Sequence, residues 1–201
     1  MAEIQLNGLL IGICGPSGVG KGTVIGKLRV EFPQFFYPVS HTTREMRPGE
    51  KDGEVYNFIT EEEFKAEMDR GNFLEWAQIH QKARYGTLKT PILKALQEGK
   101  VIIRELDIQG VRSIKAILKP ENFISIFLKP AQFEELRRRI DKRSKLPEEE
   151  IQRRLESARA ELEEMKECDY QIFSADGGIE ECYANVKALI LESAQKAGLK
   201  L

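Results

Sequence analysis

The segment that most restricts how this chain can fold is a glycine-rich loop between an apolar run and a helical pattern. Residues 9–14 are continuously apolar, as in a parallel-sheet strand that is buried on both faces. Four glycines follow within residues 15–22, and residues 23–30 then carry apolar side chains at helical spacing. This order predicts a strand, a loop and a helix, which form the first half of a βαβ unit.

Such a loop has the design of a phosphate-binding site. Glycines let backbone N–H groups converge on one point, and a helix N-terminus adds partial positive charge. A lysine at the end of the loop reaches the β- and γ-phosphates of a nucleoside triphosphate. The residues in question are Gly15, Pro16, Ser17, Gly18, Val19, Gly20, Lys21, Gly22 and Thr23. The loop alone does not distinguish a kinase from a GTPase or an ATPase, and a glycine-rich turn without function is the alternative.

The position after the lysine departs from the usual phosphate-loop motif. Ser or Thr normally stands there and ligates magnesium, whereas this chain has Gly22, with Thr23 one place later. Direct ligation of magnesium by this loop is therefore in doubt.

The rest of the chain alternates strand and helix patterns. Strands are predicted at residues 35–39, 101–103, 123–128 and 170–173, and helices at 91–97, 111–118, 131–142 and from 179 onward. This alternation predicts an α/β fold with a parallel-sheet core. Residues 41–90 interrupt it with short polar strands around a helix. Residues 137–167 interrupt it with a charged helical flap, whose thin apolar stripe indicates little contribution to the core.

Charge and cysteine content narrow the function classes. The formal net charge is −1, from 31 Lys and Arg against 32 Asp and Glu, which predicts neither a nucleic-acid nor a membrane partner. Cys14, Cys168 and Cys182 are odd in number and far apart, as for free thiols in a reducing compartment. With no signal-peptide pattern at residues 1–14, we expect a cytoplasmic protein.

A second cluster suits an anionic acceptor. Arg44 and Arg47 lie three residues apart, and two guanidinium forks can grip one phosphate from two sides. Tyr56 follows and can add a hydroxyl donor. A solvated surface loop is the alternative. Further along, Glu105 and Asp107 directly follow an apolar strand, at the edge where ligands of open α/β sheets bind.

From the phosphate loop to about residue 176, these motifs and their order resemble the guanylate kinases, of the bacterial single-domain type. The resemblance implies a P-loop nucleoside-monophosphate-kinase fold and the reaction ATP + GMP giving ADP + GDP, with Mg²⁺ held by ATP phosphates and waters. It also implies one domain over residues 1–201. Its core would be 1–39, 91–136 and 168–201, its inserted GMP-binding subdomain about 40–90, and its helical lid about 137–167.

The family pattern also implies roles for individual residues. Arg44, Arg47, Tyr56 and Tyr85 would hold the GMP phosphate, and Ser40, Glu75, Thr87 and Asp107 would surround guanine. Gly86 and Glu105 would also belong to the GMP site, where Glu105 would orient magnesium waters. Lys21, Arg44, Arg139, Arg143 and Arg154 would act in catalysis. A carboxylate such as Glu75 suits the N1 and N2 donors of guanine, and the Thr87 hydroxyl can donate to O6. Alternatively, Glu75 is a surface residue beside a core Trp76.

Three departures from the family pattern qualify the resemblance. Residues 80–84 replace the usual approach to Tyr85, Arg104 stands where an aliphatic residue is more usual, and Ser174 replaces an Asn near the expected adenine site. Two other functions remain open. One is a catalytically inactive phosphopeptide-binding module, and the other is a related P-loop kinase with another acceptor.

Overall fold

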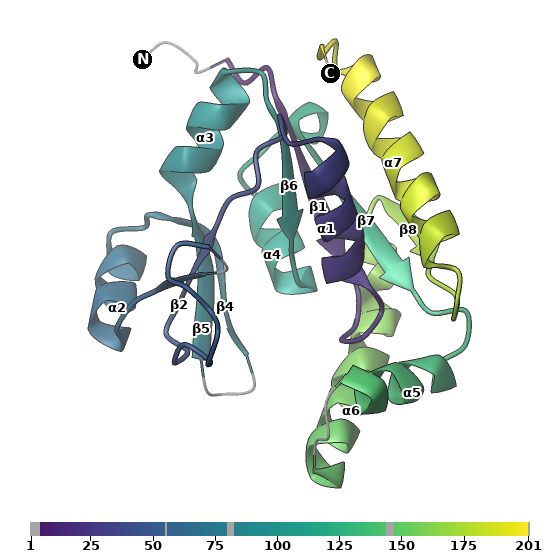
Figure 1. The fold of residues 1–201 in the computed structure, drawn as a ribbon. Coiled ribbons are helices and arrows are strands. Elements are labelled where there is room, and N and C mark those ends of the chain that lie inside the picture. Colours follow the sequence, from purple (N-terminus) through teal and green to yellow (C-terminus); the bar gives the residue numbers. More distant parts are fainter. Residues whose placement is uncertain (1–4, 55, 80–82, 144–146, 201) are drawn as a thin grey trace.

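The computed structural model describes residues 5–54, 56–79, 83–143 and 147–200 (Figure 1). Its central sheet has the strand order β6-β1-β7-β8. The strands are β1 (Leu9–Cys14), β6 (Val101–Glu105), β7 (Phe123–Lys129) and β8 (Tyr170–Phe173). All neighbouring pairs are parallel. The predicted parallel α/β core is therefore confirmed, and its strands end at one common edge.

Helices cover both faces of this sheet. Side chains that alternate along β1 belong to two apolar layers, as expected for a strand with no solvent-facing side. One layer joins β1 to α1 (Lys21–Glu31) and α7 (Ile179–Lys196). The other joins it to α3 (Lys89–Gln97) and α4 (Ile108–Lys115). A short 3-10 turn, η1 (Pro120–Asn122), leads into β7.

The strand predicted at residues 35–39 is wrong except at one point. Only Phe36 pairs with the sheet, in an isolated parallel bridge to Ile102. Its N–H donates to Val101 O at 2.9 Å, and its carbonyl accepts from Ile103 N at 3.0 Å. Pro38 has no N–H with which to continue a ladder, and the chain passes from there into a second sheet.

The second sheet is built from residues 40–88. Its order is β3-β2-β5-β4, from β2 (Ser40–Thr42), β3 (Tyr56–Phe58), β4 (Phe73–Ile79) and β5 (Ala83–Leu88). Helix α2 (Glu61–Asp69) begins at a capping box formed by Thr60 and Glu63, and its buried Phe64 stacks on Phe73 at 4.4 Å between ring centroids. This sheet lies to one side of the central sheet in Figure 1.

The charged segment after β7 forms α5 (Glu134–Arg143), α6 (Glu148–Glu164) and the 3-10 turn η2 (Met165–Glu167). The sequence indicated that its apolar stripe contributes little to the core, and that interpretation is wrong. Leu136, Ile140, Ile151 and Leu155 are buried in the same layer as α1 and α7. None of the described helices combines the length and apolar character needed to cross a membrane. The structure describes three cysteines as free thiols, all buried.

Candidate active site

The phosphate loop connects β1 to α1 at the carboxyl edge of the central sheet (Figure 1). Gly15 has φ +132°, and a Cβ there would lie 2.3 Å from Leu128 O, so the loop needs glycine to pass β7. Gly20 is the left-handed N-cap of α1. Within the described residues no side chain caps this helix, in contrast to α2. The first N–H groups of α1 are therefore free to bind an anion.

Lys21 lies over this loop. Its Nζ donates to Gly15 O and to Pro16 O, the latter at 3.2 Å, and lies 3.6 Å from Glu105 Oε1. The Lys21 side chain is 13% exposed. The structure thus brings the lysine of the loop and the carboxylate at the end of β6 together.

A second group of predicted residues gathers on β2, β3 and β5. Ser40 pairs with Tyr56 across β2 and β3, and the Arg44 guanidinium lies 5.5 Å from the Tyr56 ring centroid. The Tyr56 and Tyr85 rings meet edge to face at 5.5 Å. Burial raises the pKa of Tyr56, so its hydroxyl stays a proton donor at neutral pH.

Glu50 organises the two arginines of this group. Both of its carboxylate oxygens accept from Arg44 Nη2 at 2.9 Å, and Oε2 also accepts from Arg47 N at 2.9 Å. The hydrogen bond from the Arg47 amide, followed by that from Arg44, lowers the pKa of Glu50. Arg44 is largely buried in this contact, whereas Arg47 is exposed. No role was predicted for Glu50 from the sequence, although its position shortly after Arg44 and Arg47 was the available signal.

Two of the predicted base-reading residues, Glu75 and Thr87, form a buried polar cluster that we name the base pocket. Glu75 is 7% exposed and Thr87 2% exposed, and the two are paired across β4 and β5. Thr87 Oγ1 lies 2.5 Å from Glu75 Oε1. The alternative of a surface Glu75 beside a core Trp76 is wrong, because Trp76 is 42% exposed and Glu75 takes the inward face.

Gly86 and Asp107 have local structural reasons for their positions. A Cβ at Gly86 would come within 2.8 Å of the Phe73 ring, so glycine permits that ring to pack beneath β5. Asp107 is the N-cap of α4, and its Oδ1 accepts from Gly110 N at 2.7 Å. A Cβ at Gly110 would lie 3.5 Å from Glu75 Oε2. The N-terminus of α4 therefore borders the pocket.

The sequence missed the contacts of Arg104. Its Nε donates to Thr87 Oγ1 at 2.8 Å, and its Nη2 lies 3.4 Å from Glu75 Oε1. Arg104 does not prevent burial of the first part of its strand, because Val101, Ile102 and Ile103 are all buried. Only from Arg104 onward does the strand become polar, where it reaches the pocket.

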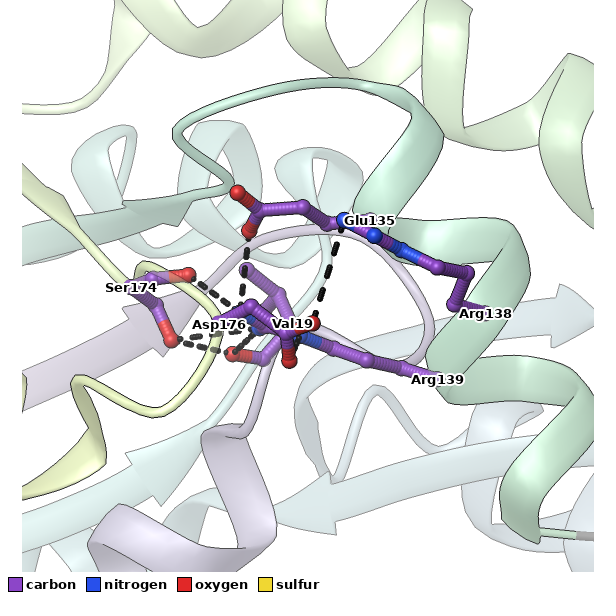
Figure 2. A network of polar contacts seen from close by, with 6 residues as sticks. All are labelled: Val19, Glu135, Arg138, Arg139, Ser174 and Asp176. Carbon is purple, nitrogen blue, oxygen red and sulfur yellow. Dashed lines mark hydrogen bonds and ion pairs between the residues drawn. The ribbon is translucent and has the colours of Figure 1, made fainter.

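Arg139 is held by a polar network that ties α5 to the phosphate loop (Figure 2). Its Nη1 donates to Val19 O at 3.3 Å, and its Nη2 donates to Ser174 O at 2.8 Å and to Glu135 Oε2 at 3.1 Å. Its Nε lies 3.5 Å from Asp176 Oδ1. Ser174 Oγ also donates to Val19 O, at 2.7 Å. Ser174, noted only as a departure from the family, is thus a buried link in this network.

The other two predicted arginines of this segment are placed differently. Arg154 lies on α6, where its Nε donates to Glu150 Oε1 at 2.9 Å, one helical turn earlier. The side chain of Arg143 lies outside the described residues, as do residues 80–82 of the altered approach to Tyr85. The structure thus brings Arg139, but not Arg154, into contact with the loop.

The parallel sheet, the lysine-bearing loop at a helix N-terminus and the sheet inserted beside them define the fold of the P-loop nucleoside monophosphate kinases. The family model for guanylate kinase matches residues 8–193. The chain belongs to the guanylate kinase family.

Individual relatives agree with that assignment. A guanylate kinase of Corynebacterium efficiens is 39% identical over 192 residues, covering 95% of this chain and 99% of the relative. One of Bifidobacterium longum is 44% identical over 174 residues, covering 86% and 89%. The crystal structure of guanylate kinase from Anaplasma phagocytophilum superposes with a TM-score of 0.76 at 28% identity, covering 96% of this chain and 89% of that one.

Proposed function

We propose that this chain transfers the γ-phosphoryl group of ATP to GMP, and that dGMP is a second acceptor. The observation that carries the proposal is the guanylate kinase match over residues 8–193. We also propose that the chain is divided into a core of 1–39, 91–136 and 168–201, a GMP-binding part at about 40–90 and a lid at about 137–167. The separate sheet formed within residues 40–88 supports that division.

The phosphate loop would bind the donor. The N–H groups at the start of α1 and the Lys21 ammonium supply positive charge at one point. In the structure Lys21 donates to carbonyls of its own loop, so bound phosphates would replace those acceptors. Phosphoryl transfer depends mainly on positioning and charge neutralisation, which this arrangement provides.

Arg44, Arg47, Tyr56 and Tyr85 would align the acceptor phosphate. Arg44 is already fixed by Glu50 and by the aromatic rings beside it, so little side-chain entropy remains to be lost when GMP binds. No side chain has to act as a strong base, because the attacking phosphate oxygen is already anionic. The base of GMP would enter the pocket of Ser40, Glu75 and Thr87.

Arginines of α5 and α6 would complete the site. Arg139 is poised against the loop through Val19 O, and Arg143 and Arg154 would approach the transferring group on closure of the lid. Closure excludes water, which otherwise competes with GMP for the phosphoryl group. The charges of these arginines would offset the negative charge of the transition state.

Mg²⁺ would accompany ATP, held by its phosphates and by water. Gly22 offers no hydroxyl, and among the described residues no three His, Cys, Asp or Glu side chains form a metal site. Glu105 places a carboxylate oxygen 3.6 Å from Lys21 Nζ, and oxygen is the donor that Mg²⁺ prefers. Glu105 fits the role of accepting hydrogen bonds from waters on the cation, which would neutralise charge between the β- and γ-phosphates.

A cytoplasmic location is also proposed, because all three cysteines are buried as free thiols, as is usual in reducing compartments.

The decisive experiment measures ADP release with GMP, dGMP, AMP, UMP and dTMP as acceptors. We expect GMP and dGMP to be used and AMP to be used poorly. Lys21→Ala should lower kcat by several orders of magnitude. Lys27→Ala is the matched control, because Lys27 lies on the same helix and pairs with Glu180 at 2.8 Å on the surface. Its rate should stay at the wild-type value.

Two results would contradict the proposal. Turnover of AMP equal to that of GMP would show that guanine is not read, in favour of a kinase with another acceptor. Absence of turnover together with phosphopeptide binding that survives Lys21→Ala would favour the binding module instead.

A further inference from the structure

Arg104 lies on β6 and extends its positively charged guanidinium into the base pocket. The three residues before it are buried among apolar side chains, and its own side chain is 15% exposed. From there its guanidinium reaches across to the second sheet, to Thr87 Oγ1 at 2.8 Å and Glu75 Oε1 at 3.4 Å. A charged group that is this buried needs hydrogen-bond and ion-pair partners, and Glu75 satisfies only part of the guanidinium.

The hydrogen-bond count of Thr87 shows why this cation matters. A hydroxyl carries one proton, and a carboxylate can only accept. Because Thr87 Oγ1 lies 2.5 Å from Glu75 Oε1 and also accepts from Arg104 Nε, its proton points to Glu75. In this arrangement Thr87 has no proton left for the O6 atom of guanine, so the role that the sequence assigned to it requires another donor.

Arg104 has the donors that Thr87 lacks. Its guanidinium carries five N–H groups, of which only those on Nε and Nη2 have a protein acceptor within the described part of the chain. Glu75 Oε2 lies on the other side of its carboxylate, near Gly110 at the start of α4. The pocket therefore presents an acceptor oxygen from Glu75 next to unused donors from Arg104.

Guanine presents the complementary pattern, with donors at N1 and N2 and acceptors at O6 and N7. Guanidinium groups match O6 and N7 with two parallel hydrogen bonds, and each such pairing discriminates strongly between bases. Adenine has an amino group at position 6, which would place a donor against a donor. A pocket with Glu75 and Arg104 side by side thus reads both halves of the guanine edge.

We propose that Arg104 is a specificity-determining residue that donates to O6 of the GMP base, while Glu75 accepts from N1 and N2 and Thr87 bridges the two. This inference rests on the proposed function. It assigns the O6 contact to a residue that the resemblance does not include among the binding residues.

The test compares acceptors that each lack part of the guanine edge. The monophosphate of 2-aminopurine riboside lacks O6 and, with it, the N1 proton, whereas inosine monophosphate keeps both and lacks the N2 amino group. Arg104→Leu should lower kcat/KM for GMP and inosine monophosphate by about 10- to 100-fold and leave the 2-aminopurine nucleotide nearly unchanged. Glu75→Gln should instead lower kcat/KM more for GMP than for inosine monophosphate, because only GMP has the N2 amino group that Glu75 accepts from.

Two further variants keep the test conclusive. Arg104→Lys retains the charge in the pocket but replaces the planar guanidinium fork by a compact ammonium group, so it should recover part of the GMP preference even where Arg104→Leu folds poorly. Arg70→Leu is the matched control, because Arg70 pairs on the surface with Glu67 at 2.8 Å. It should change none of the ratios. Circular dichroism and thermal melting establish that each variant is folded.

Equal losses on GMP and on the 2-aminopurine nucleotide in both Arg104 variants would overturn the inference, because Arg104 would then only support the fold or Glu75. A wild-type enzyme with no turnover of GMP would instead overturn the proposed function. The two failures are thus distinguished before any variant is compared.

Discussion

Replacement of Ser174 by alanine tests the network that joins the phosphate loop to α5. Ser174 is 1% exposed, and its Oγ donates to Val19 O at 2.7 Å. In Ser174→Ala the Val19 carbonyl keeps only Arg139 Nη1, at 3.3 Å, as a donor among the described contacts. Loss of a buried neutral hydrogen bond whose acceptor stays partly satisfied costs about 1–2 kcal/mol.

That loss is large enough to measure. For a chain of this size, each kcal/mol corresponds to about 2–4 °C in Tm, so the expected decrease is roughly 2–8 °C. Urea unfolding followed by circular dichroism gives the free energy directly, with an unchanged m-value if both states keep their compactness. Because Val19 is part of the phosphate loop, we also expect the KM for ATP to rise a few-fold while the KM for GMP stays unchanged.

Ser113→Ala is the matched control. Ser113 lies on α4, and its Oγ donates to Gln109 O in its own helix at 2.9 Å on the surface. Alanine has the higher helix propensity, so this variant should stay within about 0.5 kcal/mol of the wild type. A Ser174→Ala variant as stable as Ser113→Ala, or one whose KM values for ATP and GMP rise together, would refute the reasoning.

Two predictions concern pH. Burial raises the pKa of Asp169, but hydrogen bonds from Lys115 and Ser125 outweigh it and lower the pKa overall; its contribution to stability is present above the unfolded value of about 3.9 and is lost as pH falls through the folded pKa. In urea unfolding, Asp169→Asn should therefore destabilise the protein at pH 7, and the loss should shrink as pH falls below the unfolded value; a loss that does not change with pH would contradict this. Burial raises the pKa of Glu161, even though Lys21 lies nearby. The buried site favours the neutral carboxyl, so its contribution to stability is fully present below about pH 4.3 and is lost as pH rises through the folded pKa. Glu161→Gln should stabilise the protein at pH 7, by about 1.4 kcal/mol for each pKa unit of that increase, and should have little effect at pH 4, whereas lower stability at pH 7 would count against it.

The sequence predicted elements best where local chemistry is strong. The buried run at β1, the glycine loop and the periodic pattern of α7 all lie where they were expected, and α2 lies within residues 41–90, where a helix among short strands was expected. Prediction failed where long-range pairing decides the outcome. Residues 35–39 have strand composition, but only Phe36 pairs with the central sheet. The apolar stripe of α5 and α6 is part of the core because it joins the same apolar layer as side chains of α1 and α7.

The residues of the candidate site show the same contrast between local motifs, which the sequence reveals, and long-range contacts, which it does not. Lys21 follows from a local motif, because the loop and helix that position it are contiguous in the chain. Arg104 and Ser174 were visible only as departures from a family pattern. Their partners Thr87 and Val19 lie 17 and 155 residues away in the chain, so spacing gave no indication of these contacts.

By itself, the sequence determined the parallel α/β class, the phosphate loop and the family resemblance, since these depend on periodicity, glycine placement and short motifs. Only the tertiary structure decided which polar groups share a buried pocket. Glu75, Thr87 and Arg104 come from three different strands of two sheets, and burial then requires each donor to find an acceptor. That requirement ties the base pocket to the core sheet and leaves donors of Arg104 available for a ligand.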